Sequence, residues 1–449
     1  MSRTCVRQRC GTCGYESSQW LGRCPGCGEW GSFDAAPGPA PGAALVAPLT
    51  APQPIAEVDG LGAARLPTGV GELDRVLGGG IVAGSVTLVG GEPGMGKSTL
   101  LLQALGSLAA RGHRCLLVSA EESAAQVRLR ADRLGTLAPD LLVVTETSLP
   151  VIAAHVEATG PVVCAIDSIQ TVHDPDAPGA AGSVAQVRDG AQAVVRLAKA
   201  RGMSVLLVGH VTKDGGLAGP RALEHVVDTV LSFEGDRHHA LRMLRALKHR
   251  FGPTDELGLL EMTEDGLAAV DDPSGLFLAD RRAGAEGSVV TCAIEGSRPL
   301  CVEVQALVAK SGGQYPRRVT QAIDATRLAT LLAVLENHAG VEVAGRDVYA
   351  SIAGGARVAD PGVDLAVALA VAGAHLGRPT DPDTVVIGEL GLGGEVRQAP
   401  PAGRRLGEAQ RLGFRSAVVP RSTPDVRGIT LIRVGDLREA LDATVPIRR

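Results

Sequence analysis

Aromatic residues are scarce and make up 2% of the 449 residues. No stretch approaches the roughly 18 consecutive apolar residues that a membrane-spanning helix requires, and the N-terminus lacks the apolar core of a secretory signal. We therefore expect a cytoplasmic protein without a membrane segment. With 44 Lys and Arg against 49 Asp and Glu, the charge balance excludes the broad basic surface of a histone-like nucleic-acid coat.

Cysteine is also sparse and unevenly distributed. Nine cysteines, an odd number, are too few for a disulfide scaffold in a chain of this length. Five of them fall within the first 27 residues. The other four, Cys115, Cys164, Cys292 and Cys301, stand singly in apolar surroundings, so we expect them to be small core residues.

Composition divides the chain into four parts. Residues 1–34 contain both tryptophans, and residues 35–56 contain six prolines and no charge, which indicates a spacer. Over residues 57–275, short Val/Leu/Ile runs alternate with helical patterns, which predicts an α/β domain with a mostly parallel sheet and helices on both faces. Residues 276–449 are expected to form a separate α/β domain, and no internal repeat of fixed period is present.

Two Cys-x-x-Cys pairs, Cys10/Cys13 and Cys24/Cys27, are separated by ten residues. Four thiolates at this spacing match the tetrahedral coordination of structural Zn²⁺, and so short a segment needs the metal to fold. A redox-active pair is the weaker alternative, because such a pair is single and lies in a βαβ unit. Cys5 falls outside the spacing and is not expected to be a ligand. A role in DNA contact, partner binding or stability alone stays open.

A phosphate-binding loop follows the apolar run at 85–90. Residues 91–98 match the pattern G-x-x-x-x-G-K-[ST] and precede a helical pattern. We expect the loop amides to hold the phosphates of ATP, Lys97 to reach the terminal phosphates, and Ser98 to bind Mg²⁺. The predicted nucleotide-binding residues are Gly91, Glu92, Pro93, Gly94, Met95, Gly96, Lys97, Ser98 and Thr99.

Acidic residues follow two further apolar runs. Asp167 ends one run at the sheet edge where ligands of open α/β sheets bind, and we expect it to hold Mg²⁺ through water. Its alternative is a turn or N-cap residue. Glu121 is our choice for the base that orients the attacking water; alternatively, Glu121 and Glu122 are ordinary acids in the first turn of a helix. His210 either senses the terminal phosphate or is an ordinary polar residue.

With these motifs the sequence resembles the RadA (Sms) family of bacterial recombination and repair ATPases over essentially its whole length. The family combines a four-Cys zinc finger, a RecA-like ATPase core, a Lys-Asn-Arg-Phe-Gly motif and a C-terminal domain similar to Lon protease. The short motif appears here at residues 248–252, with His249 in place of the Asn.

The resemblance implies a hexameric ring with nucleic acid in its channel and ATP between subunits. Lys248 and Arg250 would then reach the nucleotide of the neighbouring subunit and stabilise charge on the transferred phosphoryl group. A plain charged strand edge is the alternative. Two Gly-rich segments, 171–183 and 211–221, suit channel loops, with Lys213 and Arg221 as candidate DNA contacts, although ordinary surface loops would look the same.

The Lon-like region lacks the chemistry of its namesake. Lon uses a serine activated by a lysine, but residues 311–449 contain no lysine, and Asp364 stands where the Lon pattern would place the serine. We predict a proteolytically inactive domain that serves in assembly or DNA binding. Its arginines form either basic stripes or scattered solvated charges; they include Arg317, Arg318, Arg327, Arg346, Arg357, Arg404 and Arg405.

The resemblance implies an ATP hydrolase stimulated by single-stranded DNA, a helicase-like motor that acts on single-stranded and branched DNA. It would promote branch migration of RecA-mediated strand exchange in double-strand break repair, using ATP, Mg²⁺ and Zn²⁺. One alternative is a non-motor ATP switch that loads or scaffolds a recombinase on DNA. An ATP-dependent protease is disfavoured by the missing serine and lysine, and a recombinase like RecA by the zinc segment and the Lon-like tail.

Overall fold

The computed structural model describes residues 8–17, 19–35, 54–55, 65–177, 179–210, 221–235, 241–313, 315–353 and 358–444. The chain divides into two units, Met1–Ala269 and Val270–Arg449. The predicted boundary at residue 275 lies inside helix α7 (Pro273–Leu278), which belongs to the second unit. Most of the expected linker, Lys213 and the side chain of Arg221 lie outside the described residues.

The N-terminal segment is a three-stranded antiparallel ribbon. Its strands are β1 (Gln8–Cys10), β2 (Glu16–Ser17) and β3 (Phe33–Ala35), with β1 in the middle. The small core contains Phe33 and two cysteines, Cys10 and Cys24. So little apolar surface leaves metal binding as the main source of stability.

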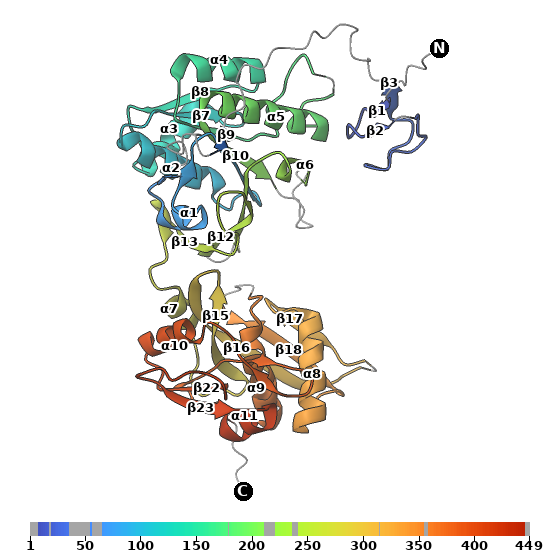
Figure 1. Cartoon of the computed structure of the whole chain (residues 1–449), viewed down its shortest axis with the longest axis vertical. Coiled ribbons are helices and arrows are strands. Elements are labelled where there is room, and N and C mark those ends of the chain that lie inside the picture. Colours follow the sequence, from blue (N-terminus) through green and yellow to red (C-terminus); the bar gives the residue numbers. More distant parts are fainter. Residues whose placement is uncertain are drawn as a thin grey trace. The chain divides into compact units, whose positions relative to one another are not determined.

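The first unit also contains a nine-stranded sheet in the order β14-β13-β12-β11-β6-β10-β9-β7-β8. Its strands β8, β7, β9 and β10 are labelled in Figure 1. The six strands from β11 to β8 are parallel, and the other three extend the sheet in antiparallel fashion. The parallel strands are β6 (Val86–Gly91), β7 (Cys115–Ser119), β8 (Leu141–Thr145), β9 (Val163–Asp167), β10 (Ser204–His210) and β11 (Thr229–Gly235); the antiparallel ones are β12 (Leu241–His249), β13 (Leu257–Thr263) and β14 (Gly266–Ala269). A separate two-stranded sheet pairs β4 (Arg65–Leu66) with β5 (Ile81–Val82).

Helices cover both faces of the large sheet, as the alternating pattern predicts. One apolar cluster packs α1 (Gly71–Val76), α2 (Lys97–Ala110) and α3 (Ala124–Arg133) against one face. A second cluster packs α4 (Leu149–Thr159), α5 (Val184–Arg201) and α6 (Arg221–Glu224) against the other. The central strands are therefore apolar on both sides, as in other parallel sheets.

Glycines set the turn between β6 and α2. β6 reads VTLVGG and is buried throughout. A Cβ on its last residue, Gly91, would lie 2.4 Å from the carbonyl oxygen of Phe233 on β11, so only glycine fits there. Gly96 is the N-cap of α2 at φ 104°, a conformation that glycine adopts readily. This tight turn carries the loop amides to the carboxyl edge of the sheet.

The second unit contains a seven-stranded sheet in the order β17-β18-β16-β15-β19-β22-β23. Two of its helices, α8 (Ala325–Ala339) and α9 (Asp364–Leu376), pack against each other. The strands are β15 (Ser288–Glu295), β16 (Arg298–Lys310), β17 (Arg318–Gln321), β18 (Arg346–Ile352), β19 (Thr384–Val386), β22 (Ser416–Pro420) and β23 (Thr430–Val434). The remaining elements are η4 (Pro361–Val363), β20 (Glu389–Leu390), β21 (Val396–Arg397), α10 (Ala402–Arg411) and α11 (Leu437–Thr444).

Two of the cysteines expected to be small core residues, Cys292 and Cys301, are buried but form a disulfide, which the sequence did not predict. β15 and β16 form an antiparallel hairpin in which Cys292 lies directly opposite Cys301, and the two are bonded. The register of a hairpin decides such a pairing, and the apolar sequence around each cysteine does not reveal it. Cys115 and Cys164 are free and buried.

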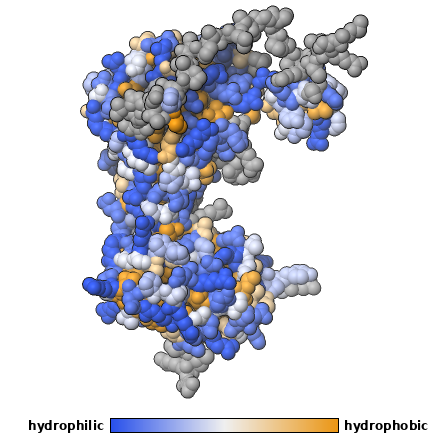
Figure 2. Space-filling model, in the orientation of Figure 1, coloured by the Kyte–Doolittle hydropathy of each residue, from blue (hydrophilic) through white to orange (hydrophobic). Residues whose placement is uncertain are grey.

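Figure 2 shows a predominantly hydrophilic face on which hydrophobic residues form separate patches. Among the helices of the described residues, none combines the length and apolar character needed to cross a membrane.

Arg405 lies in the core of the second unit and does not belong to a basic stripe on the surface. It is 2% exposed and is paired with the carboxylate of Asp360. Its guanidinium also donates to the carbonyls of Cys292 at 2.8 Å, Ala399 at 2.9 Å and Pro400 at 3.0 Å. One side chain thus joins α10 to η4 and β15.

Replacing Arg405 with alanine should destabilise the second unit by about 3–5 kcal/mol, because the carboxylate of Asp360 would remain buried without its partner. Differential scanning calorimetry of the whole chain measures the change. Arg404→Ala, on the exposed side of the same helix, is the matched control and should shift stability by less than about 0.5 kcal/mol. Equal effects of the two substitutions would contradict the buried pair.

Candidate functional site

The four predicted zinc ligands converge at one point of the ribbon. The Sγ atoms of Cys10, Cys13, Cys24 and Cys27 all lie within 4.8 Å of one another. Both Cys-x-x-Cys turns close alike: the amide of the glycine after the second cysteine donates to the carbonyl of the first at 2.8 Å. Four soft donors at this separation fit a structural Zn²⁺ site.

The thiol groups favour a bound cation. Burial raises the pKa of Cys13 to about 12, and neighbouring thiols such as Cys24 also raise it. Burial acts in the same direction on Cys10, but a hydrogen bond with Ser32 and bonds with backbone amides outweigh it and bring the pKa to about 6. Four thiolates at this distance would repel one another, and a divalent cation removes that repulsion.

The predicted phosphate-binding loop forms one wall of a cavity of about 510 Å³. Lys97 is 5% exposed, and its ammonium donates to the carbonyls of Gly91 at 2.7 Å and Glu92 at 2.8 Å. Burial lowers the pKa of Lys97, and the carboxylate of Asp167 only partly opposes this shift. The ammonium thus folds back on its own loop, at the place where phosphate oxygens could replace the two carbonyls.

Two predicted acids face the same cavity. β7 and β9 are neighbours with Ser119 opposite Asp167, so the residues that follow these strands meet at one edge. Burial raises the pKa of Asp167, and a hydrogen bond with Ser98 opposes the shift. Ser98 and Asp167 together could hold Mg²⁺ between the loop and the sheet. Glu121 lines the cavity and accepts a hydrogen bond from Ser168 Oγ.

Sequence motifs do not identify several basic residues of this cavity. Arg242 on β12 is 6% exposed and donates from Nε to the carbonyl of Met95 at 3.1 Å. Arg130 on α3 pairs with Glu122 at 2.6 Å. These arginines are distant from the loop in the chain and reach it only through the fold. The lining consists of Pro93, Gly94, Gly96, Lys97, Ser98, Thr99, Ser119, Glu121, Glu122, Arg130, Arg133, Asp167, Val208, Arg242 and Met262.

The Lys-His-Arg-Phe-Gly motif at 248–252 lies at the opposite edge of the sheet. β12 is antiparallel to β11, and His249 is opposite Thr229, which pairs with Thr87 near the start of β6. At a rise of ~3.3 Å per residue, this level lies about 13 Å from Gly91 along β6. The fold therefore does not bring the cations of the motif to the nucleotide cavity of their own chain.

The two cations of the motif have different partners. Lys248 Nζ donates to the carbonyls of Glu224 at 2.5 Å and Val227 at 2.8 Å. The side chain of Arg250 is 53% exposed, and its Nη1 lies 3.5 Å from Asp228 Oδ1. Lys248 is thus engaged by its own chain, whereas the guanidinium of Arg250 is accessible.

His249 joins the end of β12 to the turn after α1. Its Nδ1 lies 2.9 Å from Thr229 Oγ1, and its Nε2 lies 3.3 Å from the carbonyl oxygen of Leu77. Burial lowers the pKa of His249, so the neutral ring accepts from Thr229 and donates to Leu77. An asparagine side chain offers the same pair of acceptor and donor, which explains how histidine can occupy this position.

The two predicted channel segments differ in what the structure describes. Segment 171–183 is held by Gln186, whose Nε2 donates to the carbonyls of Asp174 at 3.2 Å and Ala177 at 2.8 Å. Most of segment 211–221, including Lys213, lies outside the described residues, as do the side chains of Arg221 and His210.

Asp364 takes part in an ion pair within the second unit. It is 1% exposed at the start of α9, and the guanidinium of Arg327 on α8 binds both of its oxygens. Burial raises the pKa of Asp364, while Arg327 opposes the shift. A carboxylate paired in this way offers no nucleophile of the serine type, so Ser-Lys proteolysis has no basis at this position.

Three described arginines of the second unit bind groups of their own chain. Arg318 donates to the carbonyls of Val343 at 3.1 Å and Ala344 at 3.0 Å, so it is structural like Arg327 and Arg405. Arg357 lies outside the described residues.

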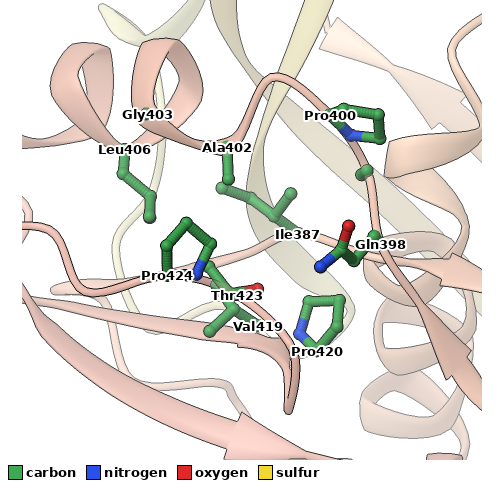
Figure 3. A pocket seen from close by; sticks show the side chains of 11 residues that line it. Ile387, Gln398, Pro400, Ala402, Gly403, Leu406, Val419, Pro420, Thr423 and Pro424 are labelled. Atoms are coloured by element: carbon green, nitrogen blue, oxygen red, sulfur yellow. The ribbon is translucent and has the colours of Figure 1, made fainter.

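A cavity of about 210 Å³ beside α10 is lined by apolar residues, three prolines, Thr423 and Gln398, and none of its lining residues ionises (Figure 3).

Three segments match known family models. Residues 9–35 match the rubredoxin metal binding domain, residues 52–216 the AAA domain, and residues 329–423 the subunit ChlI of Mg-chelatase. Together with the structure, these matches confirm the predicted fold class: a four-Cys zinc ribbon, a P-loop ATPase domain with a mostly parallel sheet, and a C-terminal α/β domain of the ChlI and Lon type.

Curated relatives align with the chain from end to end. The DNA repair protein RadA of Bacillus subtilis (strain 168) is 43% identical over 98% of this chain and 99% of its own length. The protein of the same name from Mycobacterium tuberculosis (strain H37Rv) is 45% identical over 100% of this chain and 95% of its own length. That of Brucella abortus (strain 2308) is 46% identical over 95% of this chain and 94% of its own length.

Removing the metal should unfold the ribbon, because its small apolar core leaves metal binding as the main source of its stability. Both tryptophans of the chain, Trp20 and Trp30, lie in the ribbon, so the anisotropy of tryptophan fluorescence reports on this segment alone. We expect the anisotropy to fall on chelation and on Cys13→Ser, together with loss of bound zinc. Cys5→Ser is the control and should retain one zinc per chain; zinc loss in that variant would show a different ligand set.

His249 should make the stability of the first unit depend on pH. The folded state keeps the ring neutral, so the unfolded state binds a proton first as the pH falls below about 6.5. The contribution is complete above that pH and is lost as the pH falls further. Melting temperatures at about pH 7.5 and about pH 5.5 test this: acid should lower that of the wild-type chain more than that of His249→Asn. Equal shifts would contradict a neutral, doubly bonded ring.

Proposed function

The chain belongs to the RadA family of DNA repair proteins, and on that premise we propose that it is a DNA-stimulated ATPase motor that promotes branch migration of RecA-mediated strand exchange. It would act on single-stranded and branched DNA as a hexameric ring. Its role in DNA repair, its ATPase domain and its four-Cys ribbon follow from the family and the domain matches.

The placement of the reacting groups at two edges of one sheet is the observation that carries the proposal. Lys97, Asp167 and Glu121 share the carboxyl edge of the parallel strands. Arg250 lies at the other edge and is accessible. A cation placed there can act only on the nucleotide of another copy, so hydrolysis would require assembly of subunits around ATP.

In the proposed reaction, the loop amides and Lys97 bind the phosphates. Ser98 and Asp167 would hold Mg²⁺, which neutralises phosphate charge when bound. Glu121 holds the attacking water and takes its proton as the oxygen bonds to the γ-phosphorus and the bond to the β–γ bridging oxygen breaks. Arg250 of a second copy stabilises the charge on the transferred group, and ADP and phosphate leave.

The alternative, a non-motor switch that loads a recombinase, draws support from the composition of one expected channel loop. Residues 171–183 contain two aspartates and no lysine or arginine, so they offer no cation for DNA phosphates. A switch would hydrolyse ATP without displacing a DNA strand. Strand displacement coupled to hydrolysis therefore separates the two functions.

Lys97→Ala should abolish hydrolysis, and Arg250→Ala should lower the DNA-stimulated rate by about 10³-fold, the lower range for an arginine that acts across an interface. Steady-state ATPase assays with and without single-stranded DNA measure both effects.

Mixing the Lys97→Ala and Arg250→Ala variants tests whether Arg250 acts on the nucleotide of a neighbouring copy. An interface that joins the intact loop of the Arg250→Ala chain to the intact Arg250 of the Lys97→Ala chain would be complete, so mixtures should recover part of the activity. Mixtures that stay inactive would place Arg250 outside the reaction of a neighbouring copy, and rates indifferent to DNA would remove the motor.

A further inference from the structure

The two glutamates after β7, Glu121 and Glu122, lie in a turn whose backbone is hydrogen-bonded to the ends of β7 and β9. Ser119 Oγ donates to the carbonyl of Glu122 at 2.7 Å and accepts from the amide of Glu122 at 3.2 Å. The amide of Ala120 donates to the carbonyl of Asp167 at 2.7 Å. The backbone of Glu121 and Glu122 is therefore held at the carboxyl edge, and the two side chains start from defined positions.

These neighbouring side chains meet different partners. Glu121 accepts a hydrogen bond from the hydroxyl of Ser168, the residue after Asp167. Glu122 is bound by Arg130, whose Nη2 lies 2.6 Å from Oε1 of the glutamate. The side chain of Arg130 is only 28% exposed and that of Glu122 only 35%. A charge-assisted hydrogen bond of this length, partly shielded from water, is among the stronger polar contacts.

Arg130 is carried by a well-anchored helix. α3 begins with a capping box formed by Ser123 and Gln126, and it buries Val127 and Ala131 in the core. Its last residue, Arg133, donates to the carbonyl of Glu264 at 2.7 Å, which ties the helix to the turn between β13 and β14. The guanidinium of Arg130 therefore occupies a fixed place in the wall of the nucleotide cavity.

We infer that Arg130 is a positioning residue for ATP hydrolysis: it neutralises Glu122 and so leaves Glu121 as the one glutamate of the pair that can hold the attacking water. The inference rests on the proposed role of Glu121. Without Arg130, the carboxylates of Glu121, Glu122 and Asp167 would all face a polyanionic nucleotide. Glu122 would then compete for the water and for Mg²⁺, which slows the chemical step more than it weakens nucleotide binding.

The test compares kcat and KM for Mg-ATP in the whole chain. Arg130→Gln should lower kcat by about tenfold and change KM by less than about threefold, the signature of a lost transition-state arrangement. Adding Glu122→Gln removes the uncompensated charge, so the double variant should recover to within about threefold of the wild-type kcat. Arg128→Gln, an exposed arginine on the same helix that does not line this cavity, is the matched control and should match the wild type.

Two results would overturn the inference. A double variant as slow as Arg130→Gln would mean that Arg130 does not act through Glu122, and a raised KM with unchanged kcat would mean that it only binds nucleotide. Glu121→Gln at the wild-type rate would instead refute the proposed base, a failure recognised independently of Arg130. Calorimetry checks folding; should Arg130→Gln not fold, Arg130→Met, which also removes the charge, takes its place, and Glu122→Gln should again restore its kcat.

Discussion

The direction of the strands is the constraint on which the candidate site depends. Parallel strands end at the same edge, so β6, β7 and β9 deliver the phosphate-binding loop, Glu121 and Asp167 to one place although they are far apart in the chain. The same rule sends the end of antiparallel β12 to the opposite edge. The strand directions alone, and not the chemistry of the residues, place Arg250 at the opposite edge from Lys97, Glu121 and Asp167.

Burial then sets the charge state of the cavity. Lys97 is held among backbone carbonyls where desolvation lowers its pKa, and Asp167 sits where desolvation raises its pKa. The positive charge of Lys97 and the negative charge of Asp167 stabilise each other, and this attraction partly offsets the effect of burial on Lys97. In the proposed function, a magnesium nucleotide would bring phosphate oxygens to Lys97 and a cation to Asp167, so each charge would gain a partner on binding.

The sequence predicts what is local and misses what the fold assembles. The loop at 91–98 and the four cysteines could be identified because the residues that carry their chemistry are consecutive or regularly spaced. The disulfide of Cys292 escaped because it depends on hairpin register. The roles of Arg130 and Arg405 could not be predicted, because the sequence does not show whether an arginine on a helix faces solvent, a cavity or a buried carboxylate.

The position of Arg250 on the far edge of the sheet has a consequence for stoichiometry. If each nucleotide cavity is completed by the next copy, every subunit is at once a donor and a recipient. A closed ring then satisfies all of its cavities, whereas an open row of the same subunits always leaves an incomplete cavity at one end and an unused Arg250 at the other. The rate of ATP hydrolysis per subunit would thus depend on whether the ring is closed. Opening the ring to admit a DNA strand would inactivate one site while the other sites continue to hydrolyse ATP.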